Sequence, residues 1–394
     1  MDRTILHCDL NNFFASVAVL DNPTIKNCPI AVCGSTEERH GIVLAKNELA
    51  KKFGVKTAEA TWEAKRKCPD LVTVPPTYKR YNEVSNAVKQ IYLSYSDKVE
   101  PFGIDECWLD VTGSRLLFGS GEEIAEKLRQ QIKREMGVTI SVGVSFNKVF
   151  AKLGSDLKKP DAVTVISREN YKEKVWPLPA DSMLGVGRAT LAQLSSLGIF
   201  SIGDIAAAGQ EVLKKRLGKM GEQLYIFANG DDRSPVETEQ SIPKSVGRTT
   251  TTKHDIKSAD EAWPIILALS EEISATLRKH GLYCNTVQAH IRTFDLNTKE
   301  FQAPLLLPTQ SSVAMAKKCM EIIKQNFGFA TPLRSVGLRA INLTDGITPY
   351  QTDIFNDFTQ EEEKSRVEDK IFEIRKKYGS DSVIRGTTIK FIDD

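Results

Sequence analysis

The sequence predicts an α+β protein of several domains, and two observations support this fold class. Segments with strand and helix character alternate over the first 165 residues and again over 241–345, with short, glycine-punctuated helices between them over 166–232. The length of 394 residues, at roughly 150 residues per domain, favours two or three domains. Residues 346–394 follow as an acidic tail.

The first block predicts a ferredoxin-like sheet. It opens with the apolar strand TILHCDL, and a long helix at YNEVSNAVKQIYLSYS precedes strand-like VEPFGIDECWLDVTG. A helix at EEIAEKLRQQIKREMG and the strand TISVGVS follow. If residues 11–75 are an insertion, the order β, α, β, β, α, β remains, and we expect its helices on one face of the sheet. Within the insertion, PIAVCG and GIVLA have strand character and NELAKKFG has helix character.

The second block has the same order of elements. We expect strands at SVGRTTTT, YCNTVQAHIRTF, EFQAPLLL and RSVGLRAINL, and helices over 259–280 and 311–326. Basic residues outnumber acidic ones here, whereas the tail is acidic, an asymmetry typical of a module that binds a partner. In the tail, residues 360–378 predict a helix with an acidic start and a basic end, which suits the helix dipole.

Composition excludes several classes of protein. A net charge of +2, from 53 basic and 51 acidic residues, excludes a simple polycation but not a protein that binds nucleic acid with one face. Apolar runs fall short of the roughly 18 to 20 residues of a membrane span, and the start lacks the features of a secretory signal. The seven cysteines are scattered without a CxxC. We therefore expect a cytoplasmic protein with reduced thiols, not a membrane protein.

Three carboxylates are the most informative residues. Asp9 ends the first strand, and Asp105 and Glu106 are adjacent in an otherwise apolar segment. Adjacent strand residues point to opposite faces, so a shared site needs a turn, which Gly103 permits. Clustered carboxylates need a compensating cation, and oxygen-only ligands suit Mg²⁺ or Mn²⁺. The alternative is that Asp9 caps the next helix and Asp105 completes a turn, which spacing alone favours.

Three segments together carry more information than spacing. HCDLNNFFAS, GIDECWLDV and SVGVSFNKVFAKLGSDLKKP resemble, in the same order, the core motifs of the Y-family DNA polymerases, and most closely those of the DinB branch. The similarity runs from residue 1 to about 345. It implies a right-hand polymerase with a ferredoxin-like palm (1–10 and 76–165), small fingers (11–75), a helical thumb with a helix–hairpin–helix (166–232) and a βαββαβ little finger (241–345).

The resemblance implies a metal-dependent active site. Matched by position, Asp9, Asp105 and Glu106 are the catalytic carboxylates, and they bind two Mg²⁺ ions, or Mn²⁺, with the carbonyl of Leu10 as a further ligand. Two such ions bridged by carboxylates would stabilise the attacking and leaving oxygens of phosphoryl transfer.

The resemblance also implies a binding site for the incoming dNTP. Phe14 falls at the aromatic gate, where its ring would collide with a 2′-hydroxyl, and Phe13 lies beside it, with core packing as its alternative role. Lys51 and Lys159 align with basic residues that reach the triphosphate. For Lys159 the alternative is a solvated surface charge.

Two positions depart from the family pattern. Asn11 stands where relatives often have an acid, and Glu48 stands where the fingers usually carry a tyrosine three residues before the basic residue. An acid near a triphosphate is electrostatically unfavourable, so we expect weaker nucleotide affinity unless Lys46 or Arg80 compensates.

DNA contacts are expected in the thumb and the little finger. Glycines in LGVGRATLAQLSSLGI permit close approach of backbone N–H groups to a phosphate at a helix start, and basic residues on hydroxyl-rich strands can follow a phosphate backbone. The alternatives are a plain helical turn and an ordinary solvated sheet face. The candidate residues are Gly185, Gly187, Lys244, Arg248, Lys253 and Arg334.

The tail contains Gln351, Ile354 and Phe355, similar to the short peptide by which bacterial polymerases bind the sliding clamp. A glutamine with two apolar anchors can donate hydrogen bonds at one end and fill a pocket at the other. The resemblance thus implies three partners: primer–template DNA, dNTPs and the sliding clamp. It also implies a monomer that is associated with the nucleoid.

The resulting hypothesis is a template-directed, low-fidelity DNA polymerase for translesion synthesis without a proofreading exonuclease. One alternative is a nucleotidyl cyclase, since a ferredoxin-like palm with paired acids could serve it, but the thumb and the basic second sheet argue against it. Another is a degenerate, non-catalytic DNA- or clamp-binding relative in which Glu48 has abolished nucleotide binding.

Overall fold

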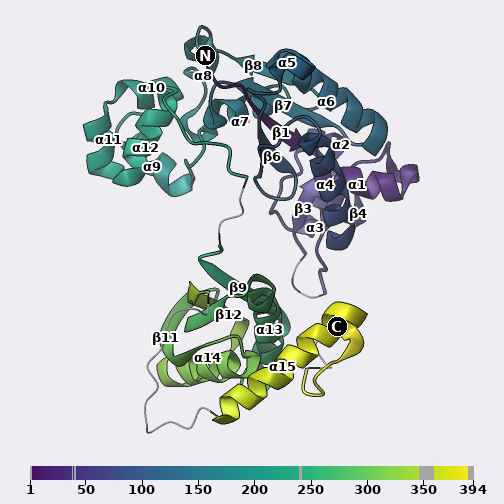
Figure 1. Ribbon diagram of the computed structural model, residues 1–394, viewed down its shortest axis with the longest axis vertical. Helices are drawn as coiled ribbons and strands as arrows, with labels where there is room; N and C mark the ends of the chain where they lie inside the picture. The colour runs from purple at the N-terminus through teal and green to yellow at the C-terminus, as the bar shows by residue number, and fades with distance from the viewer. Residues whose placement is uncertain (1, 38, 40, 239–241, 346–358, 389–394) are drawn as a thin grey trace. The chain divides into compact units, whose positions relative to one another are not determined.

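The computed structural model describes residues 2–37, 39, 41–238, 242–345 and 359–388. The chain divides into two compact units, one of residues 1–34 and 41–240 and one of residues 35–40 and 241–394. Figure 1 shows the helices and strands of both units.

A five-stranded sheet forms the centre of the first unit. It contains β1 (Ile5–Leu10), β5 (Val99–Pro101), β6 (Glu106–Asp110), β7 (Ile140–Ser145) and β8 (Val163–Ile166). The order is β5-β6-β1-β7-β8. The first four strands are antiparallel, and β8 is parallel to β7. The ferredoxin-like order is therefore present with one additional strand, and β1 is at its centre.

Helices cover both faces of this sheet, which corrects the expectation of helices on one face. On one face, α4 (Tyr78–Leu93) and α6 (Gly121–Met136) pack against Leu6, Cys8 and Leu10 of β1. On the other, α7 (Lys148–Leu157) packs through Ala151, near Ile5. The physical reason is that parallel neighbours such as β7 and β8 need a crossover connection, and α7 supplies it.

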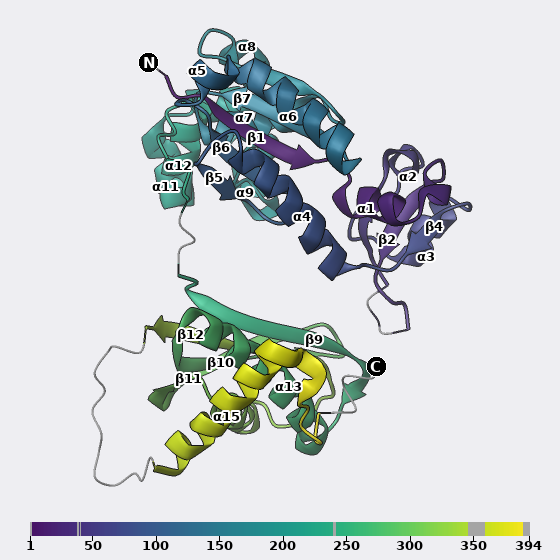
Figure 2. The same ribbon diagram turned by 45° about the vertical axis from the view of Figure 1, so that its right-hand side comes forward.

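A small sheet is inserted after β1. Its strands are β2 (Ile30–Cys33), β3 (Val43–Lys46) and β4 (Val72–Val74), in the order β3-β2-β4, with helices α1 (Phe13–Asp21), α2 (Glu48–Lys52) and α3 (Thr61–Lys67). The α1 helix joins the two sheets, because Phe13 and Val17 pack in the core beneath the large one. Figure 2 shows this insertion beside the first turns of α4.

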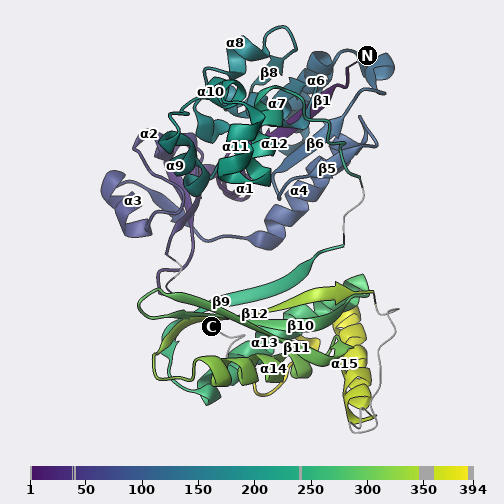
Figure 3. The same cartoon turned by 90° about the vertical axis from the view of Figure 1, so that its left-hand side faces the viewer.

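Short helices complete the first unit. They are α5 (Arg115–Phe118), α8 (Tyr171–Val175), α9 (Arg188–Ser196), α10 (Ile202–Ala207), α11 (Gln210–Leu217) and α12 (Lys219–Ala228). Figure 3 shows α9 to α12 as one cluster. These four helices share an apolar core that includes Leu194, Ile205, Leu213 and Leu224.

The second unit is a four-stranded antiparallel sheet with helices on one face. Its elements are β9 (Ser245–Ile256), α13 (Ala259–His280), β10 (Tyr283–Thr293), β11 (Thr298–Thr309), α14 (Ser312–Asn326) and β12 (Leu333–Thr344), and the strand order is β11-β10-β12-β9. Alternate residues of β10 and β12, such as Val287 and Leu338, form the core with α13 and α14. The other face of the sheet carries polar and charged side chains.

The tail adds α15 (Thr359–Tyr378), close to its predicted bounds. It docks on α13, since Arg278 Nε donates to Asp369 Oδ1 at 2.8 Å. It also docks on the start of α14, where Glu368 Oε2 accepts from the Ser312 backbone N–H at 3.0 Å.

All seven cysteines are free thiols, and six of them are buried. None of the helices in the described part of the chain is both long and apolar enough to span a bilayer.

Candidate active site

Strand register places Asp9 and Glu106 directly opposite each other on β1 and β6. Both side chains therefore lie on the face of the sheet that α7 covers. Asp9 is buried, and Glu106 is partly buried. The α1 helix is capped by the backbone at Asn12 without a side-chain hydrogen bond, so the alternative in which Asp9 caps this helix is not what the structure shows.

Asp105 joins the pair from a turn rather than from the strand. Gly103 has a φ of 89°, a left-handed conformation that favours glycine. Phe102 N donates to Glu106 O at 2.8 Å, and Leu10 N donates to Asp105 O at 3.0 Å. The turn predicted from the adjacent acids is thus present, and Leu10 fixes it to the end of β1.

Two lysines of the α7 region pair with these acids. Lys159 Nζ lies 2.6 Å from Asp9 Oδ2 and 2.7 Å from Asp156 Oδ1, and Lys152 Nζ lies 2.7 Å from Glu106 Oε2. Lys159 therefore lies beside the carboxylates, in contact with Asp9; its predicted contact with the triphosphate stays a prediction. The pairing compensates part of the negative charge of the cluster.

Burial and pairing move the pKa values of the three acids in different directions. Burial raises the pKa of Asp9 to about 6, although Lys159 opposes the rise, and burial also raises the pKa of Asp105. Burial would raise the pKa of Glu106 as well, but its contacts with His7 and Lys152 outweigh this effect and lower it to about 2. An added cation would favour the ionised forms of Asp9 and Asp105.

The donor set fits Mg²⁺ or Mn²⁺ in chemistry, since every side-chain ligand is a carboxylate oxygen. The Lys159 ammonium lies against Asp9, so the site already holds a positive charge at this carboxylate. As they stand, however, no three His, Cys, Asp or Glu side chains among the described residues are gathered closely enough to enclose an ion. Ion binding at Asp9 therefore requires that the Lys159 ammonium move away.

Asn11 has a structural role that the sequence did not reveal. Its side-chain oxygen accepts from Thr139 Oγ1 at 3.1 Å and from Asp161 N at 2.8 Å, and its amide donates to Ser141 Oγ at 2.8 Å. With both lone pairs of the oxygen used, Asn11 is not available as a metal ligand. It instead holds the turn that follows Lys159.

Phe13 and Phe14 differ in burial, and Phe13 has the core position that was its alternative role. Phe13 is buried in the core, and Phe14 is partly exposed. The Phe14 ring stacks on Tyr81 of α4 with ring centres 4.1 Å apart and planes 7° apart, and Tyr78 packs edge-on against it. This aromatic wall gives Phe14 a fixed position.

Glu48 and Lys51 lie together on α2. Lys51 Nζ is 3.6 Å from Glu48 Oε1, and 60 % of its side chain is exposed. Asn12 Nδ2 also donates to Glu48 at 3.4 Å. Lys46 donates to Thr57 and remains close enough to Glu48 for its charge to be felt, whereas Arg80 pairs with Asp21 and Glu83. Compensation for Glu48 at the nucleotide stays a prediction.

The two predicted phosphate-binding glycines start α9. Gly185 has a φ of 92°, and Gly187 is the N-cap residue with φ −86° and ψ 179°. A Cβ on Gly187 would meet no atom within 4 Å. The helix start is thus open to a ligand at Gly187, whereas Gly185 is glycine for conformational reasons.

The predicted basic residues of the second unit do not share one face. Arg248 pairs across the sheet with buried Leu338, so it points to the helix-covered face, where its Nε lies 2.9 Å from Glu272 of α13. Lys253 is exposed on β9, and Lys244 precedes that strand. Arg334 lies at the register shift between Leu333 and Ser335.

The open face of the same sheet carries basic residues that were not predicted. Arg339 of β12 lies opposite Gln288 of β10, and Arg292 and His290 follow on the same face of β10. The sequence contained a signal for Arg339: it is five residues from Arg334, so regular alternation along a strand places the two side chains on opposite faces of the sheet. Gln351, Ile354 and Phe355 lie outside the described residues.

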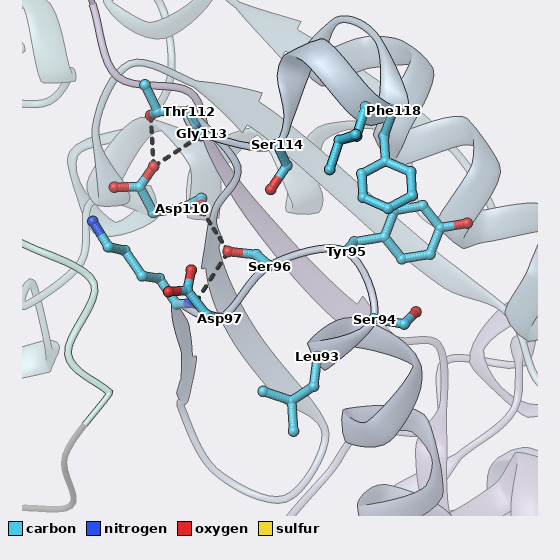
Figure 4. Close-up of a pocket in the computed structure, with 12 residues that line it drawn as sticks. Leu93, Ser94, Tyr95, Ser96, Asp97, Asp110, Thr112, Gly113, Ser114 and Phe118 are labelled. Atoms are coloured by element: carbon cyan, nitrogen blue, oxygen red, sulfur yellow. Dashed lines mark hydrogen bonds between the residues drawn. The ribbon is translucent and has the colours of Figure 1, made fainter.

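A separate cavity of about 530 Å³ lies at the far end of β6, between the end of α4 and α5. Figure 4 shows that Asp110 points to Thr112. Its carboxylate accepts from the Thr112 N–H at 3.0 Å. None of the predicted site residues lines this cavity.

Comparisons with known proteins agree with this architecture. Residues 8–156 match the impB/mucB/samB family, residues 243–354 match its C-terminal domain, and residues 181–232 match the thumb domain of DNA polymerase-iota. The chain is 46 % identical to the DNA polymerase IV of Acetivibrio thermocellus, over 99 % of this chain and 98 % of the relative. It is 33 % identical to DNA polymerase IV 1 of Bacillus subtilis, over 98 % and 94 %.

A solved structure is also similar. A chimeric Y-family DNA polymerase matches with a TM-score of 0.77 and 25 % identity, over 86 % of this chain and 98 % of that one. The right-hand polymerase fold is thereby confirmed, and the relatives support a catalytic polymerase rather than a binding-only protein. The chain therefore belongs to the Y family of DNA polymerases, in its DNA polymerase IV group, and is a DNA-directed DNA polymerase.

Proposed function

We propose that this polymerase extends primers past damaged template bases with low fidelity, using Asp9, Asp105 and Glu106 and two Mg²⁺ ions. The observation that carries the proposal is the pairing of Asp9 with Glu106 across β1 and β6, with Asp105 in the adjoining turn. When bound, the ions would align the primer 3′-hydroxyl with the α-phosphate and neutralise developing charge. The carboxylates would hold them, with the Leu10 carbonyl as a further ligand.

The other residues would bind and select the nucleotide. Lys159, once displaced from Asp9, is placed to bind the triphosphate as a flexible point charge. Lys51 is exposed and can reach the same group. Phe14, backed by Tyr81, would exclude a 2′-hydroxyl, and Phe13 would support it from the core.

The positions of the elements support a proposed domain assignment. We assign residues 1–10 and 76–165 to the palm, 11–75 to the fingers, 166–232 to the thumb and 241–345 to the little finger. DNA would bind at Gly187 in the thumb and along the open sheet face of the little finger, through Lys253, Arg292 and Arg339. The enzyme would act as a monomer in the cytoplasm, bound to the sliding clamp through 351–355.

Primer extension tests the proposed function. Wild type should extend a primer on an undamaged template with Mg²⁺ and dNTPs, Asp105→Ala should not, and the exposed acid change Asp97→Ala should extend it normally. Formation of a cyclic nucleotide from a triphosphate, with no need of primer or template, would favour the cyclase class. Intact DNA binding without extension by wild type would favour the binding-only relative.

A second experiment tests the clamp. Replacing Gln351 and Phe355 by Ala should abolish binding to the sliding clamp and leave distributive synthesis intact. Unchanged clamp affinity would show that the peptide is not the binding element.

A further inference from the structure

His7 lies on the same face of β1 as Asp9 and is completely buried. Its Nε2 is 3.2 Å from Glu106 Oε2, and its Nδ1 is 2.8 Å from Ser155 Oγ. The ring packs edge-on against Trp108 at 5.2 Å. The imidazole is thus held on three sides, by Glu106, Ser155 and Trp108. Because it is buried, it is out of reach of any substrate.

A glycine makes this arrangement possible. The neighbour of His7 on β7 is Gly143. A Cβ there would lie 1.8 Å from Ala151 O and 2.5 Å from Ser155 N, distances that no packed structure allows. Because Gly143 has no side chain, α7 approaches the sheet closely enough to place Ser155 against His7 and Lys152 against Glu106.

Two buried atoms face each other across the contact between His7 and Glu106. Within the described ranges, neither His7 Nε2 nor Glu106 Oε2 has an aligned hydrogen-bond partner. A neutral imidazole has one donor and one acceptor nitrogen. A carboxylate beside Nε2 favours the proton on that nitrogen, since a lone pair would face a second negative atom. Nε2–H then donates to Glu106 Oε2, which the Lys152 ammonium also contacts.

Ser155 determines whether that tautomer is maintained. If Nε2 carries the proton, Nδ1 must accept a hydrogen bond, and the Ser155 hydroxyl is the donor 2.8 Å away. The same hydroxyl lies 2.7 Å from the Lys152 carbonyl. The Lys152 carbonyl already accepts a backbone hydrogen bond within helix α7. The Ser155 hydroxyl can therefore turn to Nδ1 without leaving the carbonyl unpaired.

We propose that His7 is a positioning residue for the polymerase reaction: oriented by Ser155, it holds the Glu106 carboxylate from behind so that Oε1 is presented to the bound ion. This inference rests on the proposed function of Glu106. Both His7 and Lys152 contact Oε2, which leaves Oε1 for coordination. Partners of this kind typically change metal affinity about 10- to 100-fold when removed.

The matched variants are His7→Gln and His7→Asn. Both remove the ring and are neutral, but a glutamine amide reaches the position of Nε2, whereas an asparagine amide reaches only that of Nδ1. The probe is Mn²⁺, whose binding to the protein without DNA is followed by the loss of the free-ion paramagnetic resonance signal. Thermal unfolding of each variant provides the control for folding, and the Mg²⁺ dependence of primer extension separates kcat from KM for dNTP.

We expect His7→Asn to weaken Mn²⁺ binding by at least about tenfold, and His7→Gln to restore most of it. Ser155→Ala should fall between them. Equal Mn²⁺ affinity of the two His7 variants would overturn the proposal. A Mn²⁺ affinity of Ser155→Ala equal to that of wild type would also overturn it. If His7→Asn does not fold, the Ser155→Ala variant alone decides. Wild type without template-directed extension would instead refute the proposed function.

Discussion

At the scale of the residue, Asn11 shows how a departure from the family pattern can be structural. It binds β7 through Ser141 and the turn after Lys159 through Asp161. Asp161 is held from the other side by Arg129 at 2.6 Å and Lys133 at 2.7 Å. The turn that follows Lys159 is therefore held at Asp161, through both its backbone N–H and its carboxylate.

Substitution of Asp161 by Asn should loosen this turn. Burial alone would raise the pKa of Asp161, but the hydrogen bonds from Lys133 and Arg129 lower it. Because the pKa is lower in the folded state, the stabilisation is present at neutral pH and is lost as the pH falls below the ordinary aspartate value, toward 3. We expect the variant to unfold about 1 kcal/mol more easily at pH 7.

Urea denaturation at pH 7, 5 and 3 measures the effect of this change. The difference between wild type and Asp161→Asn should narrow at the acid end, and the variant should show a raised KM for dNTP at pH 7. A difference that stays constant with pH would mean that the ion pairs are not its source.

Replacement of Phe14 by Ala should raise ribonucleotide incorporation. The stacked Tyr81 and the adjacent Tyr78 fix the Phe14 ring, so its removal opens space for a 2′-hydroxyl. We expect the preference for dNTP over rNTP, as a ratio of kcat/KM, to fall by at least about tenfold. Phe53→Ala, at an exposed aromatic residue, is the control, and sugar discrimination equal to wild type in Phe14→Ala would remove Phe14 from the gate.

The sequence predicted the carboxylates but not the groups that hold them. Asp9, Asp105 and Glu106 lie in contiguous motifs, so the family resemblance pointed to them, whereas spacing alone favoured a cap and a turn. His7, Ser155 and Asn11 lie in the same motifs, yet their roles depend on partners about 130 to 150 residues away. Arg248 was assigned to DNA because a strand does not reveal in isolation which of its faces a helix covers.

At the scale of the element, the start of α9 combines two glycines with different requirements. Alanine at Gly185 would be strained at a φ of 92° and would lie 3.3 Å from Met220 Sδ. Alanine at Gly187 meets no atom within 4 Å and has an ordinary negative φ. Gly187 can therefore be changed without disturbing the fold.

Substitution of Gly187 by Ala separates folding from DNA binding. The unfolded chain loses conformational freedom, which favours alanine by about 0.4 to 1 kcal/mol, whereas the N-cap position favours glycine over alanine by a similar amount. The stability of the variant should therefore change little. If a phosphate approaches this helix start, affinity for primer–template DNA should fall. Gly113→Ala, at an equally open glycine after β6, is the matched control. Fluorescence anisotropy with labelled DNA gives both affinities, and equal binding by the two variants would refute the thumb contact.

Helices could be predicted more closely than their packing. The bounds of α13 follow from local signals, since Ser258 accepts from Glu261 N at its start and Gly281 ends it in a left-handed conformation. The position of α7 on the second face of the sheet has no such signal. It depends on β8 joining β7 in parallel, which is a tertiary property.

At the scale of the whole molecule, ion pairs fasten the tail helix to the second unit. The Glu368 side chain is 9 % exposed, and its Oε1 accepts from Ser312 Oγ at 2.7 Å and from Arg385 at 2.9 Å. Arg375 and Arg385 both pair with Glu271 of α13. The tail therefore belongs to the little-finger unit rather than extending from it.

Replacement of Glu368 by Ala should release α15. Removal of this carboxylate leaves Arg278 and Arg385 with one acidic partner each and leaves the buried Ser312 N–H without an acceptor, which costs about 1 to 3 kcal/mol. Limited proteolysis should then cleave within 359–388 faster than in wild type. Asp369→Ala removes an exposed partner of the same Arg278 and should leave the cleavage rate nearly unchanged. Similar rates in both variants would show that Glu368 does not anchor the helix.

The central position of β1 also determines how the active site behaves when the protein fluctuates. All six residues of the strand are buried, and it has a bonded strand on each side. Its amide hydrogens should therefore exchange with solvent deuterium only through the largest openings of the first unit, later than those of β3 at the edge of the small sheet. Local breathing would then open the small sheet long before it moves Asp9, so the carboxylate would be among the last groups to lose its place on heating.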